Sequence, residues 1–162
     1  MRNAVCPGSF DPVTNGHLDV FERASAMYDN VTIAVLTNSS KSALFTIEER
    51  IKFISDACAG WNNIKVVSFQ GLLVDFCKQN DISIIVKGLR AVSDFDYELQ
   101  MAQMNYRLAK VETSFIATNP EYGYLSSSLI KEISRHGGDV TGLVPNEVLK
   151  ALQAKSAQGG TK

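Results

Sequence analysis

Short apolar runs alternate with segments of helical spacing along most of this chain, and this alternation constrains the fold more than any other feature. The apolar runs are Ala4 to Cys6, Val31 to Leu36, Ile64 to Val67, Ile82 to Val86 and Phe115 to Ala117. The helical segments are about Gly16 to Tyr28, Ile47 to Ala59, Leu72 to Gln79, Phe95 to Ala109, Ser126 to His136 and Pro145 to Lys155. Continuous apolar strands separated by helices are typical of a parallel sheet that is covered on both faces. The pattern therefore predicts a Rossmann-like three-layer α/β/α fold around a doubly wound, five-stranded parallel sheet.

Length and charge narrow the class of protein further. With 162 residues, the chain has the size of one domain, residues 1–162, and the small polar residues 156–162 predict a flexible tail. The 16 Lys and Arg residues nearly balance the 17 Asp and Glu residues, so nothing predicts a nucleic-acid or anionic membrane partner. No apolar run approaches the roughly 18 residues of a membrane span. Three widely spaced cysteines indicate reduced thiols and a cytoplasmic protein.

The segment Pro7 to His17 follows the first strand and opens the first helix. Gly8 and Gly16 allow a ligand to approach the backbone, and a helix start presents free amides with partial positive charge. His17, in the first turn, adds a neutral or cationic donor, so the segment predicts an anion site. The alternative is a tight strand-to-helix turn with a surface histidine.

A second candidate is the segment Lys87 to Arg90, expected directly after the fourth strand. Ligands of doubly wound sheets bind at the carboxyl ends of strands, and two cations around Gly88 suit a phosphate-rich ligand there. An ordinary solvated loop is the alternative.

Four further features are ordinary when the residues are taken alone. Lys41 is a lysine in a serine-rich loop, Glu98 a helix carboxylate, and Leu73 a core residue by composition. The serines at 126–128 suit an N-cap, although their hydroxyls and the free amides of a helix start can also hold phosphates.

Five ordered segments then resemble one family, the bacterial phosphopantetheine adenylyltransferases. The segments are PGSFDPVTNGH (7–17), FTIEER (45–50), KGLR continuing to DFDYE (87–98), QMAQMN (100–105) and LSSSLIKE (125–132). The tetrad TNGH (14–17) corresponds to the HxGH signature of nucleotidylyltransferases, and the resemblance spans Met1 to about Leu152.

The resemblance implies transfer of AMP from ATP to 4'-phosphopantetheine in coenzyme A biosynthesis, with Mg²⁺ carried on the ATP. It implies catalytic roles for His17, Lys41, Arg90 and Ser9. The residues implied in ATP binding are Ser9, Phe10, His17, Gly88, Leu89, Arg90, Glu98, Tyr122, Gly123, Tyr124, Leu125, Ser126, Ser127 and Ser128. Those implied in phosphopantetheine binding are Ser9, Lys41, Leu73 and Lys87, and no protein metal ligand is implied.

Other readings of the function remain open at this stage. A nicotinate mononucleotide adenylyltransferase or a cytidylyltransferase would share the TNGH tetrad but not the block from Lys87 to Glu98. A non-catalytic nucleotide-binding module could use the same fold. Retention of His17, Lys41 and Arg90 together favours an enzyme, because a binder does not require donors around the reacting phosphate.

The helix expected from Phe95 to Ala109 carries two apolar stripes. One consists of Tyr97, Met101, Met104 and Leu108, and the other of Phe95, Leu99, Ala102 and Tyr106. Since a sheet covers only one side of a helix, the second stripe predicts a homo-oligomer. The resemblance sharpens this expectation to a homohexamer, built as a dimer of trimers.

Overall fold

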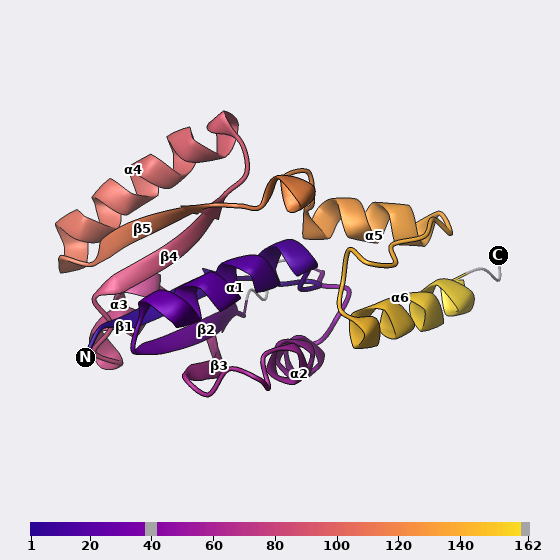
Figure 1. The fold of residues 1–162 in the computed structure, drawn as a ribbon, viewed down its shortest axis with the longest axis horizontal. Helices are drawn as coiled ribbons and strands as arrows, with labels where there is room; N and C mark the ends of the chain where they lie inside the picture. Colours follow the sequence, from indigo (N-terminus) through magenta and orange to yellow (C-terminus); the bar gives the residue numbers. More distant parts are fainter. Residues whose placement is uncertain (38–41, 160–162) are drawn as a thin grey trace.

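The computed structural model describes residues 1–37 and 42–159 and confirms the doubly wound α/β architecture (Figure 1). Five parallel strands form one sheet in the order β3-β2-β1-β4-β5. The strands are β1 (Asn3–Gly8), β2 (Asn30–Leu36), β3 (Ile64–Phe69), β4 (Ile84–Leu89) and β5 (Glu112–Ala117). Because β1 is central, the direction of winding reverses between β1 and β4, where such sheets bind ligands.

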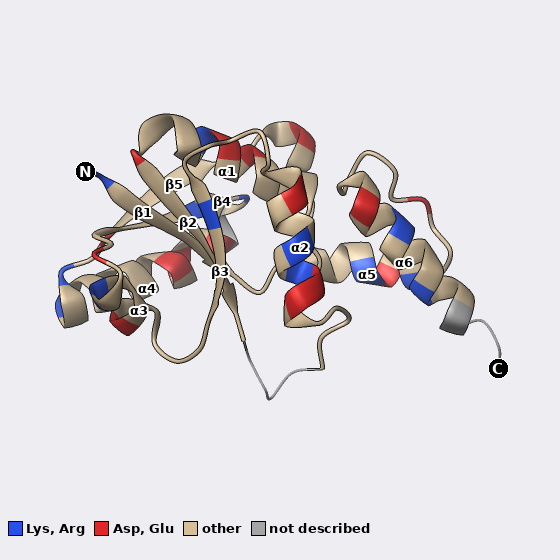
Figure 2. Cartoon of the chain, turned by 90° about the horizontal axis from the view of Figure 1, so that it is seen from below, with Lys and Arg blue, Asp and Glu red and all other residues tan. Residues whose placement is uncertain are grey.

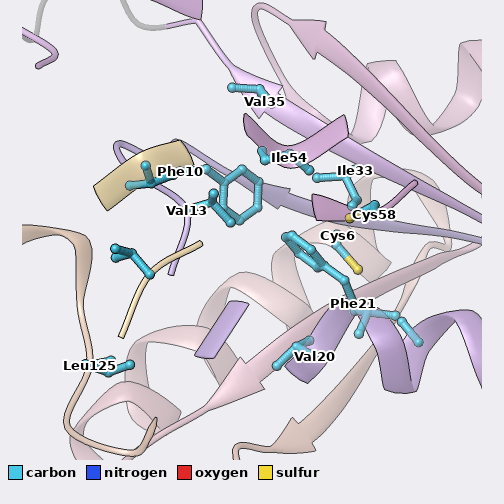
Figure 3. Packing of buried hydrophobic residues seen from close by; sticks show 14 of the residues in the cluster. Cys6, Phe10, Val13, Val20, Phe21, Ile33, Val35, Ile54, Cys58 and Leu125 are labelled. Atoms are coloured by element: carbon cyan, nitrogen blue, oxygen red, sulfur yellow. The ribbon is translucent and has the colours of Figure 1, made fainter. Parts of the chain in front are cut away.

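Helices cover both faces of the sheet (Figure 1). One face carries α1 (Asn15–Met27) and α2 (Ile47–Ala57), and the other carries α3 (Leu73–Gln79) and α4 (Val92–Ala109). Successive side chains of β1 point to opposite faces. Cys6 packs with Phe21 of α1 and Ile54 of α2 (Figure 3), whereas Val5 belongs to the cluster on the other face with Cys77 of α3. The sheet therefore has a buried core on each face.

Two further helices, α5 (Ser127–Arg135) and α6 (Asn146–Gly159), lie beyond the carboxyl ends of the strands (Figure 1). Their buried residues Ile130 and Leu152 extend the core under α1 and α2. Helix α6 continues to Gly159, beyond Lys155, where the sequence pattern predicted its end. The hydroxyl of Ser156 donates to the carbonyl oxygen of Ser134 at 3.0 Å and ties this end of α6 to α5.

Two strand ends differ from the sequence prediction. β4 continues to Leu89, since Lys87 pairs with Phe115 of β5 and Leu89 pairs with Ala117. The segment Lys87 to Arg90 is therefore not a loop after the strand: its first three residues end the strand. Likewise β1 runs through Gly8, so the loop before α1 is shorter than expected.

Helix α4 departs from the expectation that the sheet would cover one apolar stripe. Both stripes remain substantially exposed in the single chain, as at Tyr97 (64%), Met104 (53%) and Tyr106 (44%). The sheet instead receives the narrow face between the stripes, where Glu98 and Asn105 are the less exposed residues. More apolar surface is thus left on this helix than the two-stripe pattern predicts.

Charged residues of both signs are interspersed along α2 and α6 (Figure 2). The structure thus gives these two helices mixed surfaces, in line with the near-neutral net charge. Among the described residues, no helix combines the length and the apolar character needed to cross a bilayer.

Candidate active site

A cleft of about 320 Å³ opens at the carboxyl edge of the sheet, between β1 and β4. Within the described chain, these two strands pair only at Ala4 with Ile84 and at Val5 with Ile85. They separate beyond these pairs, and the residues that follow on each strand line the cleft. The polar residues of the lining are Ser9, Thr14, His17, Lys87, Arg90, Glu98, Thr118, Tyr122, Ser126 and Ser127.

His17 lies in the first turn of α1 and forms part of the N-terminal cap of that helix. The backbone N–H of Thr14 donates to Nδ1 of His17 at 3.0 Å, and the Thr14 hydroxyl oxygen accepts from the backbone N–H of His17 at 3.4 Å. This is a capping box in which histidine takes the place of the usual Glu or Gln. Because Nδ1 accepts a hydrogen bond, the proton of the neutral ring is on Nε2. His17 therefore keeps an Nε2–H donor for a ligand.

The surroundings of His17 keep its ring neutral. Burial and, second, the positive charge of Arg90 lower the pKa of His17 to about 4. The ring of Phe10 stands edge-on to the imidazole with 5.1 Å between ring centroids, and Phe21 packs edge-on against Phe10 at 5.3 Å (Figure 3). Of the two protonation states allowed by the sequence, the structure thus favours the neutral donor.

Two glycines let side chains pack closely around the cleft. A Cβ atom on Gly8 would lie 2.7 Å from the Phe10 ring, and one on Gly88 would lie 2.9 Å from a methyl group of Val20. Neither strand position can accept a side chain without displacing these neighbours. The missing side chain at Gly8 therefore leaves room for the Phe10 ring beside His17. The missing side chain at Gly88 leaves room for Val20 of α1 to contact β4.

Lys87 and Glu98 form an ion pair across the cleft lining. Nζ of Lys87 on β4 lies 3.5 Å from Oε1 of Glu98 on α4, and both side chains are about one-quarter exposed (30% and 21%). The partner of Lys87 is thus a carboxylate that the resemblance implies in ATP binding. An anion arriving at Lys87 would compete with Glu98.

Arg90 follows β4 and joins three elements. Its NH1 donates to the carbonyl oxygen of Leu125 at 2.7 Å, and its Nε lies 3.2 Å from Oδ2 of Asp94 on α4. The guanidinium therefore holds the segment before α5 while its own position is fixed by α4. Such a restrained fork suits phosphate oxygens.

The start of α5 closes another side of the cleft. Ser126 is the N-cap, and its hydroxyl oxygen accepts from the backbone N–H of Leu129 at 3.0 Å. The hydroxyl of Ser127 donates to the carbonyl oxygen of Pro12 at 2.8 Å. The Ser127 hydroxyl is thus used as a donor, whereas the Ser126 hydroxyl only accepts, so its O–H and the free backbone amides of the first turn are the groups that can meet an anion.

A smaller cavity of about 120 Å³ adjoins the cleft and shares Lys87 and Glu98 with it. Leu73, Met101 and Asn105 also line it. In the described part of the chain, the buried hydroxyl of Thr113 in this cavity has no hydrogen-bond partner. An apolar wall beside one unsatisfied hydroxyl fits a ligand with both methylene and amide groups.

The cleft gathers most of the predicted site residues. These are Ser9, Phe10, His17, Lys87, Gly88, Arg90, Glu98, Tyr122, Leu125, Ser126 and Ser127. Leu73 lines the adjoining cavity, whereas Leu89, Gly123, Tyr124 and Ser128 line neither of the two. Lys41 lies outside the described residues.

Sequence reasoning missed several lining residues, among them Thr118 of the cleft and Asn105 of the adjoining cavity. Thr118 follows β5, and its hydroxyl donates to the carbonyl oxygen of Leu89 at 3.0 Å. Its place directly after a strand was the available signal. Asn105 is a polar residue only 9% exposed on an otherwise exposed helix, which the sequence alone did not indicate.

One solved structure shows the same fold. It is a Vibrio parahaemolyticus protein provisionally named nicotinate-nucleotide adenylyltransferase, which matches with a TM-score of 0.66 and covers 94% of this chain and 99% of that chain. The two sequences are 17% identical, so this likeness shows the fold alone.

Residues 5–133 match a family model described as cytidylyltransferase-like. This match and the cleft at the switch point define the chain as a cytidylyltransferase-like nucleotidyltransferase. Proteins named phosphopantetheine adenylyltransferase are 65% identical over 152 residues in Streptomyces coelicolor (94% of this chain, 96% of the relative) and 58% identical over 162 residues in Frankia casuarinae (98% and 100%). The chain belongs to the phosphopantetheine adenylyltransferase family.

Proposed function

We propose that this chain transfers the adenylyl group of ATP to 4'-phosphopantetheine, giving dephospho-coenzyme A and pyrophosphate. Family membership supports the substrates, since the relatives are named for this reaction. The main structural support for adenylyl transfer is that the neutral His17 donor lies in one cleft with Arg90, Lys87 and the start of α5. These groups suit an arrangement in which two phosphate-bearing substrates meet.

The reaction requires alignment more than proton removal. A phosphate oxygen of 4'-phosphopantetheine forms a bond to the α-phosphorus of ATP, the bond from that phosphorus to the bridging oxygen of the β-phosphate breaks, and pyrophosphate leaves. The attacking phosphate is already anionic near neutral pH, with a second pKa of about 6. Catalysis therefore depends on positioning and on donors that meet charge as it develops at the α-phosphate.

The cleft supplies a group for each task. His17 donates Nε2–H to the α-phosphate, while Arg90 and the first-turn amides of α5 hold the β- and γ-phosphates. Lys87 leaves its ion pair with Glu98 and binds the phosphate of 4'-phosphopantetheine. Ser9 aligns the reacting groups. Lys41 is proposed as a further charge clamp on the resemblance alone, because it lies outside the described residues.

The adjoining cavity suits the pantetheine arm. Its apolar wall at Leu73 and Met101 fits methylene groups, and Asn105 and the unpartnered hydroxyl of Thr113 can pair with amides. Because Lys87 lines both cavities, a phosphate bound there places the arm beside this wall.

Magnesium ion is proposed to arrive on the nucleotide, where it neutralises phosphate charge. Glu98, the carboxylate among the residues that line the cleft, already has a cationic partner in Lys87, and Asp94 has one in Arg90. No cluster of three or more metal-ligating side chains occurs in residues 1–37 and 42–159. The donor set thus fits a cation held by the substrate and water rather than by the protein.

The proposed function is tested by following pyrophosphate when the protein is mixed with ATP, Mg²⁺ and 4'-phosphopantetheine. Release with 4'-phosphopantetheine supports the assignment. Release with nicotinate mononucleotide but not with 4'-phosphopantetheine would overturn it in favour of another nucleotidyltransferase. ATP binding without turnover of either acceptor would indicate a non-catalytic binding module.

We further propose that the chain is a cytoplasmic homohexamer, a dimer of trimers. The exposed apolar side chains of α4, including Tyr97, Met104 and Leu108, support an assembly that covers them. The three cysteines are buried free thiols, which suits a reducing compartment.

Exchange of Met104 for glutamate should lower the assembled mass, because it places a charge among these apolar side chains. The matched control is Met27→Glu on α1, a methionine of similar exposure (41% against 53%) that lies outside the α4 surface and should leave the mass unchanged. Light scattering coupled to size exclusion measures both. A wild-type particle of monomer mass would refute the assembly, and a dimer or trimer would refute only the hexamer.

A further inference from the structure

Asp11 is a buried carboxylate next to the cleft that does not itself line it. The residue is 6% exposed. Its Oδ2 accepts from the backbone N–H of Leu44 at 2.9 Å and from Nζ of Lys131 at 3.0 Å, and its Oδ1 accepts from the backbone N–H of Phe45 at 2.9 Å. One side chain thus links the loop after β1 to the segment before α2 and to α5.

The same loop is also held by hydrogen bonds that its own carbonyl oxygens accept from α2 and α5. Arg50 of α2, also 6% exposed, donates through NH1 to the carbonyl oxygen of Ser9 at 2.9 Å and through Nε to that of Thr46 at 3.3 Å. From α5, the hydroxyl of Ser127 donates to the carbonyl oxygen of Pro12. Residues 9–12 are therefore fixed to two other segments, and one of them, the start of α5, lines the cleft.

The restrained loop contains an unfavourable backbone conformation. Phe10 has a φ of 47°, in the left-handed region that an aromatic residue rarely adopts. Such conformations persist only where the surrounding contacts over-determine them, and they occur often at active sites. The contacts of Asp11 supply that restraint directly after Phe10, whose ring packs against His17.

The carboxylate is held in its charged form. Burial acts to raise the pKa of Asp11, but the backbone N–H groups of Leu44 and Phe45 and the ammonium group of Lys131 lower it below its usual value. The ion pair with Lys131 is only partly buried, since the lysine side chain is 26% exposed, and such a pair contributes little net stability compared with apolar packing. Its main structural effect is the geometry that it imposes on the three segments.

From these contacts we infer that Asp11 is a positioning residue for adenylyl transfer, which holds the loop after β1, the segment before α2 and the start of α5 in one register. In that register Ser9, His17 and the first-turn amides of α5 face a common phosphate. The inference rests on the proposed function and adds to it a residue that touches neither substrate.

The test compares Asp11→Asn with Asn63→Ala at a temperature where both variants are fully folded. Asparagine offers one acceptor oxygen in place of two, so Phe45 or the pair Leu44 and Lys131 meets an amide donor instead. Asn63 is a matched control: its side chain donates to the carbonyl oxygens of Ser25 and Tyr28 at 2.8 and 3.0 Å, just before β3 at the opposite edge of the sheet. Both variants should lose thermal stability.

The two variants should differ in turnover. Asp11→Asn should lower kcat by about tenfold or more with KM for ATP nearly unchanged, because displaced donors lose alignment in the transition state. Asn63→Ala should keep the wild-type kcat. Lys131→Met removes one of the three hydrogen bonds of Asp11 and should cause a smaller loss, and combining it with Asp11→Asn should be less than additive.

A wild-type kcat in Asp11→Asn at reduced stability, or equal losses in Asn63→Ala, would overturn the inference. Failure of the proposed function is separable, because wild type would then release no pyrophosphate with 4'-phosphopantetheine. In that case, the inference is tested by measuring hydrogen–deuterium exchange of the backbone amides in the complex with ATP. Faster exchange in residues 9–17 and 127–131 for Asp11→Asn but not for Asn63→Ala supports the positioning role, and unchanged exchange overturns it.

Discussion

Replacement of His17 by alanine is expected to lower kcat by about 10²- to 10³-fold with little change in ATP binding, the loss typical of one removed transition-state donor. The neutral ring presents Nε2–H because Thr14 occupies Nδ1, so the donor is already oriented before substrate binds. Single-turnover measurements of pyrophosphate release with ATP titrations give both quantities. A variant with near wild-type kcat would show that His17 is only structural.

The structural role of His17 can be separated from its chemical role. Alanine removes the capping box as well as the donor, whereas His17→Gln restores a residue type that completes such a box. We therefore expect His17→Gln to recover the thermal stability lost in His17→Ala but only part of the lost kcat. His136→Ala, which changes the other histidine of the chain outside the cleft lining, should match wild type in both measurements.

The half-buried ring of His17 should also shape the dependence of stability on pH. Its folded pKa of about 4 lies below the unfolded value of 6.5, so the unfolded chain takes up a proton first as the pH falls. The contribution of the neutral ring is fully present above the unfolded pKa and is lost as the pH falls from there toward 4. Urea midpoints across this range should fall more in wild type than in His17→Gln. Equal declines, or a charged His17 ring by NMR near pH 5.5, would contradict the neutral assignment.

The sequence predicted the fold well because each buried strand of a parallel sheet is a continuous apolar run. It misplaced the end of β4 because Lys87, Gly88 and Leu89 are held in the strand by pairing with β5, which no local pattern records. The same limit applies to the ion pair of Lys87 with Glu98, whose partners come together only when α4 packs beside β4. Contacts between distant segments are set by packing, and apolar periodicity does not encode them.

The protonation of His17 shows a signal that was present but not used. Thr14 and His17 have the spacing of a capping box, in which the side chain at the third helical position accepts from the N-cap N–H, and in the structure Nδ1 of His17 takes this acceptor role. By contrast, the three hydrogen bonds of Asp11 join residues far apart along the chain, whereas the sequence indicated only an anion site or a tight turn for the segment that contains it. The capping role of His17 could thus be predicted from neighbouring residues, but the hydrogen bonds that Asp11 accepts from distant residues could not.

Arg90→Ala is expected to lower kcat/KM for ATP by about 10²-fold, because the guanidinium both meets phosphate charge and holds the segment before α5. Arg23→Ala is the matched control. Arg23 likewise donates through NH1 to a backbone carbonyl oxygen at 2.7 Å, that of Ala117, and pairs with an aspartate one helical turn away, but it does not line the cleft. It should leave the rate unchanged, so a similar loss in both variants would mean that the arginine acts only through packing.

The companion variant, Lys87→Ala, should weaken binding of 4'-phosphopantetheine more than binding of ATP, because Lys87 lines both the cleft and the adjoining cavity whereas Arg90 lines only the cleft. Removal of Lys87 also leaves Glu98 without its cationic partner, and the freed carboxylate would repel an incoming phosphate. A double variant, Lys87→Ala with Glu98→Gln, should recover part of the lost affinity if this repulsion contributes. Titration of each variant with each ligand decides between the assignments: equal losses for both ligands in Lys87→Ala and in Arg90→Ala would contradict a separate role for each cation.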